Sequence, residues 1–551
     1  MWFHGAWRAR QPILLLLTYL AFNIAFSEQC IPYPITVPIH NVTLSNGDIA
    51  RGAELAIGHP PQALAFLPQW PLNNTLVYGT NGYCTDSSFS ADACTTWRGG
   101  RYDLLGSDTR RQPPDPNPVD GSPYPETTTY TDIFQVNDNV TLDDFAVGVP
   151  LSDWLQQGYH PMMALGLGSN STFLASLQTG KQIASRVWSM FYGLTGASSD
   201  AQLDGALVFG GYDQAKVSGQ GYTQKFQPDP RCESQLLVTI DDIIINFPNG
   251  TDVSIVEVTT NGSFPACIVP DYPGLMTLGN NPYFLLFEIF TNTSIYQRTL
   301  GEEYYTMLYT DGDTPYRGDL SINIRDGPSI RIPNNQLVVP ERYVDGSTGQ
   351  LMSNYSRSNL VLNSLNTVNE QDLSQLGRVF LSSAYLMVNQ DNEEFTLWTA
   401  NPTALEDLVG VDSAGKEATT FCTNSTSSIS PVSTSSAPSD SGSPMEMENS
   451  KSLSSGAIAG IVVAAVTSLA ITIGALLWRR SRSKDADTVT RAISEYQPGH
   501  TVDSQDAYKW EQQGGLPQEL HGHGREVELS GETPNQMQSS APSVQRFELG
   551  D

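Results

Sequence analysis

The chain has 551 residues, of which 58 are Asp or Glu and 29 are Lys or Arg, so its formal net charge is −29 at pH 7. This surplus of negative charge excludes binding to a nucleic-acid phosphate backbone as a main function. A charge of this size keeps a protein soluble but identifies no partner.

The first residues are typical of a secretory signal peptide. Arg8 and Arg10 precede an apolar run at residues 12–25, and the small residues after it fit a cleavage site before Glu28. The run is too short to cross about 30 Å of hydrocarbon comfortably. Residues 1–27 therefore predict export rather than a membrane anchor.

A second apolar run, residues 456–478, contains no charged residue. A helix of this length spans a bilayer, because each residue adds about 1.5 Å. The basic residues Arg479, Arg480, Arg482 and Lys484 follow it, so the positive-inside rule places the C-terminal side in the cytosol. This pattern predicts a type I membrane protein, located in the cell membrane or another secretory-pathway membrane, with its ectodomain extracellular or lumenal.

The segments on either side of this helix have compositions typical of disorder. Residues 421–455 are rich in Ser, Thr, Pro and Gly, which predicts an O-glycosylated stalk. Residues 479–551 are rich in Gln, Gly, Ser and Pro, which predicts a disordered cytosolic tail. The tail contains no kinase, phosphatase or adaptor-domain pattern, so its partner is not identified.

Asn-X-Ser/Thr sequons and cysteines are confined to the region between the signal and the membrane segment. The sequons begin at Asn41, Asn73, Asn139, Asn170, Asn249, Asn261, Asn292, Asn354 and Asn424. This distribution is expected for a glycosylated ectodomain. All six cysteines lie there too, and an even number in an oxidising compartment favours disulfides over a metal site. No CxxC or His-rich cluster is present, so no metal or other cofactor is expected.

Short β-type runs dominate residues 31–415, separated by Gly, Pro, Asn and Asp. Two examples are residues 236–240 and 243–245. Helical candidates are short and few, such as residues 173–177 and 369–376. The pattern predicts an all-β body, and its length of nearly 400 residues exceeds what one core usually supports, so two lobes are expected.

Seven short sequence blocks follow one another along this body. They are residues 37–39 with 57–62, the segment from Cys84 to Cys94 with the residues just after it, residues 131–133, 164–168, 182–185, 205–213 and 376–385. Their residue types and order resemble the pepsin-like (A1 family) aspartic proteases. The resemblance implies a bilobal β fold with a long cleft between an N-terminal lobe, residues 28–215, and a C-terminal lobe, residues 216–420.

The resemblance also implies where a catalytic acid pair would stand. Such proteases place two carboxylates close enough to share one proton, so that one acts as base and the other as acid. The family pattern puts these positions at Gln69 and Pro270, and neither side chain ionises. Asp271 is the only nearby carboxylate, and alternation of side chains along a strand turns it away unless a one-residue bulge intervenes. The chain thus resembles a protease scaffold without its catalytic pair.

The neighbouring family features depart from the pattern in the same direction. Trp70 and Tyr272 are expected at the cleft floor, where they are candidates for ligand binding, although core packing is the favoured role of Trp70. Pro118 stands where the family's flap carries a Tyr, and the body begins too soon after the signal to leave room for an inhibitory propeptide.

The resemblance implies one disulfide directly. It pairs Cys84 with Cys94 across a short loop. The remaining four cysteines allow three pairings, of which we favour Cys232–Cys267 with Cys30–Cys422.

These observations favour a non-catalytic surface glycoprotein whose pepsin-like body binds an extended peptide or a wall polymer. One alternative is an active membrane-anchored aspartic-type endopeptidase, which requires a carboxylate pair that the motif positions lack. Another is a cell-wall or surface sensor that uses the ectodomain as a spacer. No nucleic-acid partner is expected.

Overall fold

The computed structural model describes residues 30–70, 72–80, 84, 89–113, 127–151, 162–260, 262–310, 312–366 and 369–422. All of them belong to one compact unit. Strands predominate within them, which confirms the predicted all-β class. The predicted signal peptide, the segment at 456–478 and the cytosolic tail lie outside the described residues, as does the stalk after Cys422. Among the described helices, none is long and apolar enough to cross a membrane.

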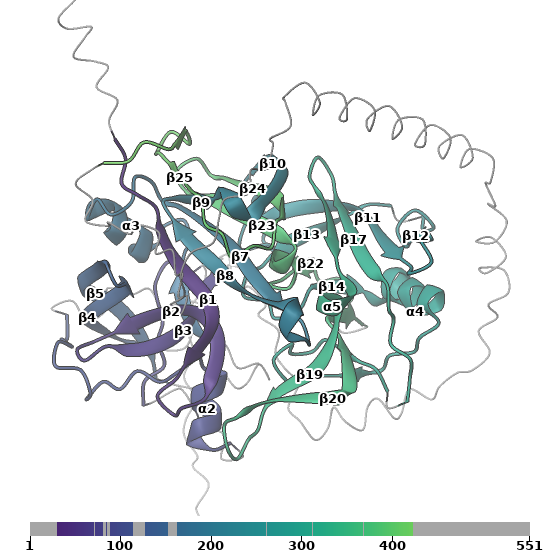
Figure 1. The fold of residues 1–551 in the computed structure, drawn as a ribbon, viewed down its shortest axis with the longest axis horizontal. Coiled ribbons are helices and arrows are strands. Elements are labelled where there is room, and N and C mark those ends of the chain that lie inside the picture. Colours follow the sequence, from purple (N-terminus) through teal and green to yellow (C-terminus); the bar gives the residue numbers. More distant parts are fainter. Residues whose placement is uncertain are drawn as a thin grey trace, which may run out of the picture. The chain divides into compact units, whose positions relative to one another are not determined.

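The largest sheet in the described residues has eleven strands and joins the two ends of the described chain (Figure 1). Its order is β10-β24-β23-β7-β8-β1-β2-β3-β6, with β4 paired to β2 and β5 paired to β4. The strands are β1 (Ile35–Thr43), β2 (Ile49–Ile57), β3 (Gln62–Gln69), β4 (Thr127–Asn137), β5 (Val140–Pro150), β6 (Met163–Gly166), β7 (Val187–Thr195), β8 (Gln202–Phe209), β10 (Val217–Lys225), β23 (Ala384–Asn389) and β24 (Glu394–Ala400). Because β23 pairs with β7, strands from both predicted lobes share this sheet.

A second sheet of eight strands contains most of the later chain, in the order β18-β17-β11-β13-β22-β14-β21, with β12 paired to β11. Its strands are β11 (Leu237–Asn246), β12 (Asp252–Ser254), β13 (Phe264–Ile268), β14 (Met276–Gly279), β17 (Asp319–Ile324), β18 (Ser329–Ile332), β21 (Leu362–Leu365) and β22 (Ser374–Leu376). The two runs predicted at 236–240 and 243–245 form the single strand β11.

Two smaller sheets complete the described strands. One has the order β15-β16-β20-β19 and the other β26-β25-β9. Their strands are β15 (Gln297–Arg298), β16 (Met307–Leu308), β19 (Val338–Val344), β20 (Leu351–Leu360), β9 (Gly211–Asp213), β25 (Leu408–Val411) and β26 (Glu417–Ala418). The β19–β20 hairpin reaches α2 near the start of the chain, where the backbone N–H of Ser90 donates to the carbonyl of Gly346 at 2.8 Å.

The described helices are short. They are α2 (Ala91–Trp97), α3 (Thr172–Thr179), α4 (Leu285–Thr291), α5 (Asn334–Leu337) and the single turns η2 (Ser199–Ala201), η3 (Gln214–Lys216), η4 (Asn280–Phe284) and η5 (Phe380–Ser382). The helix predicted at 173–177 is confirmed as part of α3, which Ser171 caps by accepting from the N–H of Leu174. The helix predicted at 369–376 is wrong: a turn there leads into β22, whose pairing with β13 overrides the local pattern.

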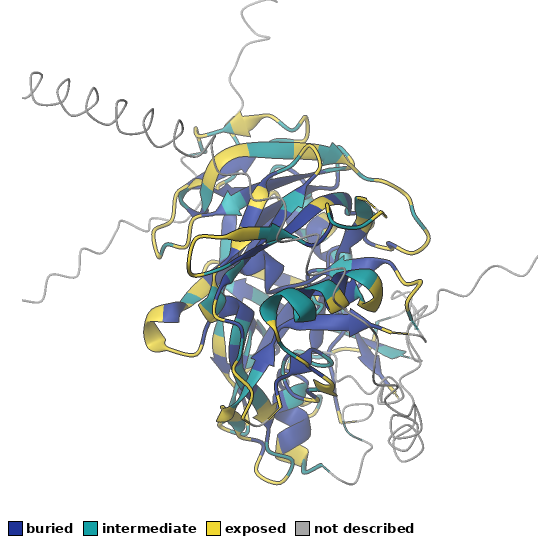
Figure 2. Cartoon of the chain, turned by 90° about the vertical axis from the view of Figure 1, so that its right-hand side faces the viewer, coloured by how far each residue is buried: buried dark blue, intermediate teal, exposed yellow. Residues whose placement is uncertain are grey.

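Alternation of side chains explains why these segments form strands. In β1 the buried residues Ile35, Val37 and Ile39 alternate with more exposed ones, as expected for a sheet with one face on the core. Phe134, Phe145 and Phe173 pack together beneath the first sheet, with ring centroids of Phe134 and Phe145 4.9 Å apart. Figure 2 shows the buried residues inside the sheets and the exposed ones along loops.

Three disulfides brace the described residues, and all three predicted pairs are confirmed. They are Cys30–Cys422, Cys84–Cys94 and Cys232–Cys267. The first joins the two ends of the described chain, where Ile31 and Phe421 also pair as a short parallel bridge.

Candidate functional site

The first feature of the site is a crossover at the end of β3. This strand runs parallel to β6, and Gly166 on β6 lies opposite Gln69. Trp70 and residues 72–75, the described part of the first crossover loop (70–75 in sequence), precede Leu76, which pairs antiparallel with Ala164 of β6 and parallel with Gly148 of β5. A Cβ on Gly166 would lie 2.4 Å from the carbonyl oxygen of Asn74, so only glycine lets this loop pass so close to β6.

The same arrangement occurs again in the second sheet. Strand β13 runs parallel to β22, and residues 269–275, the second crossover loop, lead to β14. Met276 of β14 pairs antiparallel with β22 and parallel with β21. A Cβ on Gly377, just after β22, would lie 2.4 Å from the carbonyl oxygen of Gly274. The chain therefore contains two crossovers with the same strand directions and the same close glycine.

The two glycines fix how the crossovers correspond. Gly166 lies opposite Gln69. In the second sheet, the last pair of β13 and β22 is Ile268 with Leu376. Val269 and Gly377 directly follow these two residues, so by continuation of the register Val269 lies opposite Gly377. Gln69 and Val269 therefore hold matching places, and neither has an ionisable side chain.

This register differs by one residue from the correspondence predicted by counting along the sequence. The strand register matches Pro270 with Trp70, whereas counting along the sequence matches Pro270 with Gln69. Neither correspondence places a carboxylate at matching positions. Asp271 is the only Asp or Glu in the sequence of the two crossover loops.

Gln69 and Trp70 are both buried, with 5% of each residue exposed. The carbonyl of Gln69 accepts from the N–H of Leu167 at 3.1 Å. The indole of Trp70 packs edge-on against Phe226, with ring centroids 5.6 Å apart, as part of the main core. Its Nε1–H is buried and has no acceptor among the described residues. Trp70 thus packs in the core rather than forming an open binding surface.

Asp271 and Tyr272 lie half-buried in a turn of the second crossover loop, closed by the Tyr272 N–H to the Val269 carbonyl at 3.0 Å. Burial raises the pKa of Asp271 to about 6, against the opposing effects of a backbone hydrogen bond and of the Arg378 guanidinium. The Tyr272 ring would contact a Cβ on Gly377 at 2.5 Å, so it packs directly on the crossover. Burial also raises the pKa of Tyr272.

Arg378 also lies at the candidate site, although no sequence motif points to it. It directly follows the crossover glycine, and its side chain is buried. Its backbone N–H donates to the Tyr272 carbonyl at 2.9 Å, and its Nη2 donates to the Glu302 carbonyl at 2.9 Å. The guanidinium also lies 5.7 Å from the ring centroid of Tyr192. The only sequence signal is the arginine itself: in the pepsin-like proteases that residues 376–385 resemble, an Asp follows Leu-Gly.

Residues 299–306 lie next to the second crossover loop and contain two glutamates, Glu302 and Glu303. Glu302 donates its N–H to the Arg342 carbonyl at 2.8 Å, and the Glu303 carboxylate forms an ion pair with the Arg342 guanidinium. Burial raises the pKa of Glu302, opposed first by Arg378. The methyl group of Thr306 would lie 2.9 Å from a Cβ on Gly274. The second crossover loop is therefore contacted by a segment that carries two glutamates.

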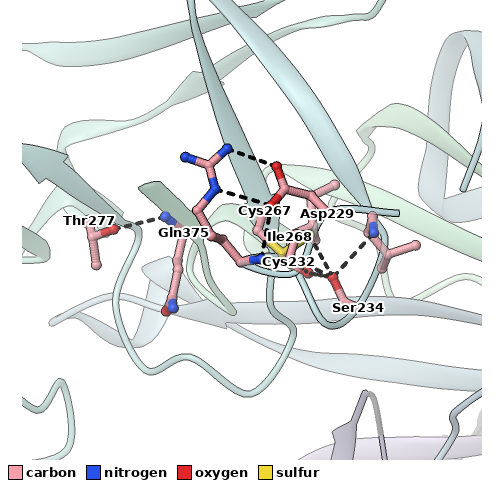
Figure 3. Close-up of a disulfide and its surroundings, with 9 residues drawn as sticks. Asp229, Cys232, Ser234, Cys267, Ile268, Thr277 and Gln375 are labelled. Carbon is pink, nitrogen blue, oxygen red and sulfur yellow. Dashed lines mark hydrogen bonds and ion pairs between the residues drawn. A yellow bond between two sulfur atoms is a disulfide. The ribbon is translucent and has the colours of Figure 1, made fainter. Parts of the chain in front are cut away.

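The disulfide Cys232–Cys267 braces β13 immediately before this loop (Figure 3). The hydroxyl of Ser234 lies 3.1 Å from the sulfur of Cys267 and donates to the carbonyl of Ile268 at 2.8 Å. Thr277 of β14 accepts from the backbone N–H of Gln375 at 2.8 Å. These contacts hold β13, β22 and β14 together around the crossover.

The predicted sequons differ in how accessible their asparagines are. Exposed are Asn41, Asn139, Asn170, Asn249 and Asn292, whereas Asn73 and Asn354 are half-buried. Asn261 and Asn424 lie outside the described residues, as does Pro118 of the predicted flap.

The site has limited options for chemistry. Within the described residues, no group of three or more His, Cys, Asp or Glu is placed to hold a metal ion. The carboxyl group of Asp271, with a pKa raised to about 6, feels the charge of the Arg378 guanidinium, and the two crossover loops supply no second carboxylate with which a proton could be shared. No model of a known protein family matches the chain, and no curated protein matches it.

Proposed function

We propose that the chain is a single-pass cell-surface glycoprotein whose pepsin-like ectodomain is a non-catalytic binding module. The duplicated crossover supports the pepsin-like assignment, because two related lobes are what the family resemblance implies. The seven sequence blocks and the disulfide Cys84–Cys94 agree with it.

One observation supports the proposed absence of catalysis. The aspartic mechanism needs two carboxylates at matching positions, and the crossover register gives Gln69 with Val269 and Trp70 with Pro270. Asp271 lies one residue further and has Arg378 as its charged neighbour. A guanidinium there stabilises a carboxylate and supplies no second proton acceptor.

A pepsin-like scaffold retains a use without its acid pair. Extended peptides bind to such clefts through backbone hydrogen bonds and side-chain pockets, which do not depend on the catalytic groups. The proposed ligand is an extended peptide. On a cell surface that bears a wall, a wall polymer is the alternative ligand. The stalk and the apolar segment at 456–478 would hold the module above the cell membrane, with the tail in the cytosol.

Selection from a display library of random peptides tests this proposal. The full-length chain, purified in detergent, is expected to enrich extended peptides whose binding falls in a Tyr272→Ala variant, because Tyr272 packs on the crossover. Tyr355→Ala, at an exposed position on β20, is the matched control and should bind normally. A lack of enrichment, or equal binding by both variants when both are folded by circular dichroism, would contradict the proposal.

An aspartic-type endopeptidase is the second candidate, and Asp271 is the observation that favours it. Its carboxyl group titrates near the pH of acidified compartments and lies on the loop where the family carries an aspartate. This candidate requires a second carboxylate to join it, and the two crossover loops contain none.

A further inference from the structure

Exposed apolar side chains gather on the hairpin formed by β19 and β20. Tyr343 is 38% exposed, Met352 is 40% exposed and Tyr355 is 74% exposed. Solitary exposed apolar residues are ordinary, whereas neighbouring ones favour a contact surface. We call Tyr343 and Met352, with the sheet face they share, the hairpin face.

The register of the hairpin places a glycosylation sequon on this face. Tyr343 pairs with Met352, and two residues further along Glu341 pairs with Asn354. Side chains two apart on a strand share a face, and paired residues on neighbouring strands share it too. Asn354 therefore lies on the same face as Tyr343 and Met352, next to Met352.

The backbone around Asn354, which is half-buried, is irregular. Pairing with β19 shifts between Ser358 and Asn354, so residues 355–357 have no partner on β19 and form a bulge. The Asn354 Oδ1 accepts from the Ser356 hydroxyl at 2.7 Å and from the Ser356 N–H at 3.1 Å. These bonds hold the carboxamide oxygen and are made within the sequon itself.

Other parts of the hairpin contact neighbouring elements. At its tip, the carbonyl of Gly349 accepts from the hydroxyl of Thr96 on α2 at 2.7 Å. On the opposite face, Arg342 donates to the Thr195 carbonyl at 2.7 Å and forms an ion pair with Glu303. On the hairpin face, Glu341 is buried and accepts from the Thr299 hydroxyl, whereas Tyr343 and Met352 remain exposed.

We propose that Asn354 carries an N-linked glycan that packs over Tyr343 and Met352 and shields the hairpin face from water. The inference rests on the export proposed above. A lipid-pyrophosphate-linked oligosaccharide is the donor: the bond from its anomeric carbon to the phosphate oxygen breaks as the carbon bonds to Asn354 Nδ2. The lipid pyrophosphate leaves, and one amide proton is lost to a base. The apolar faces of the sugar rings then contact the tyrosine and methionine side chains.

Glycopeptide mass mapping of the full-length chain, made in a cell line that adds N-glycans, gives the first test. Occupancy at Asn354 is expected. An unmodified Asn354 in a chain whose other sequons carry glycans would overturn this inference and leave the export proposal standing. A chain without glycans at any sequon would overturn both.

The shielding role is tested with variants. Asn354→Gln and Ser356→Ala both remove the glycan, and each should raise the aggregated share of the detergent-purified chain in size-exclusion chromatography and lower its surface level. Asn249→Gln, in the exposed turn after β11, is the matched control and should behave as wild type. Adding Tyr343→Thr and Met352→Thr to Asn354→Gln should restore the monomer, which a mere folding defect at Asn354 would not allow. A monomeric Asn354→Gln chain, or a failure of this rescue, would overturn the shielding role.

Discussion

Asp271 carries its carboxyl group in surroundings that disfavour a negative charge. Burial raises its pKa to about 6, whereas an aspartate in an unfolded chain titrates near about 3.9. The folded state therefore binds this proton more tightly than the unfolded state. The stabilisation is fully present below the unfolded pKa and is lost as the pH rises through about 6.

An Asp271→Asn substitution should reveal this titration. Near neutral pH the variant should be more stable than wild type by about 1–3 kcal/mol, because it has no charge to bury and one pKa unit corresponds to about 1.4 kcal/mol. At about pH 4 the gain should be largely lost, because folded wild type is then protonated at Asp271.

Denaturant unfolding of the two proteins at both pH values measures this difference. Asp138→Asn, in an exposed turn, serves as the control for a generic loss of negative charge. A gain of the same size at both pH values would contradict the buried titration of Asp271.

At the scale of elements, the two crossovers depend on Gly166 and Gly377. In each case the loop backbone passes so close that a Cβ would lie 2.4 Å from a carbonyl oxygen. Backbone atoms give way less easily than side chains, so neither position accepts alanine without moving the loop. Gly166→Ala and Gly377→Ala should therefore lower the free energy of unfolding by similar amounts.

Gly377→Ala should lower the free energy of unfolding by about 2–3 kcal/mol or more, because the added methyl group overlaps the second crossover loop. Gly279→Ala, in neighbouring β14, meets only a ring carbon of Tyr283 at 3.7 Å and should change stability little. Thermal unfolding followed by circular dichroism compares the two. Equal stability of both variants would show that the loop does not pass as closely as described.

The sequence predicts those parts of the fold that local patterns determine. Alternating apolar residues predict strands such as β1, and the family resemblance predicts Cys84–Cys94. The other four cysteines allow three pairings by sequence, and the structure shows the favoured one, Cys30–Cys422 with Cys232–Cys267. The helix expected at 369–376 is wrong because β22 owes its conformation to pairing with β13 and β14, which lie far away in sequence.

The candidate site shows the same limit. Counting residues places Gln69 and Pro270 in matching roles, but only the pairing of strands shows that Val269 lies where Gln69 does. Arg378 was missed because its partners, Glu302 and Tyr192, come from other elements. Contacts of this kind leave no periodic signal in the sequence.

At the scale of the whole molecule, the disulfide Cys30–Cys422 links segments separated by 392 residues. Strands from the start and the end of the described chain already share the eleven-stranded sheet. A cross-link over so long a loop restricts the unfolded chain strongly, whereas Cys84–Cys94 spans only 10 residues.

Replacing Cys30 and Cys422 together by serine should therefore lower the free energy of unfolding by about 2–5 kcal/mol, and by more than the matched change at Cys84 and Cys94. Denaturant titration of the three proteins measures the order. A larger loss from the Cys84 and Cys94 change would indicate that native packing, rather than loop length, decides what each disulfide contributes.

The absence of proteolysis is the central claim, and a cleavage assay tests it most directly. The purified, glycosylated full-length chain is incubated with a denatured protein substrate from about pH 2.5 to about pH 7, with and without a statine-type transition-state inhibitor. We expect no inhibitor-sensitive cleavage at any pH, because Gln69, Trp70, Val269 and Pro270 provide no acid pair. Inhibitor-sensitive cleavage that Asp271→Asn abolishes would contradict this account and make Asp271 a catalytic residue.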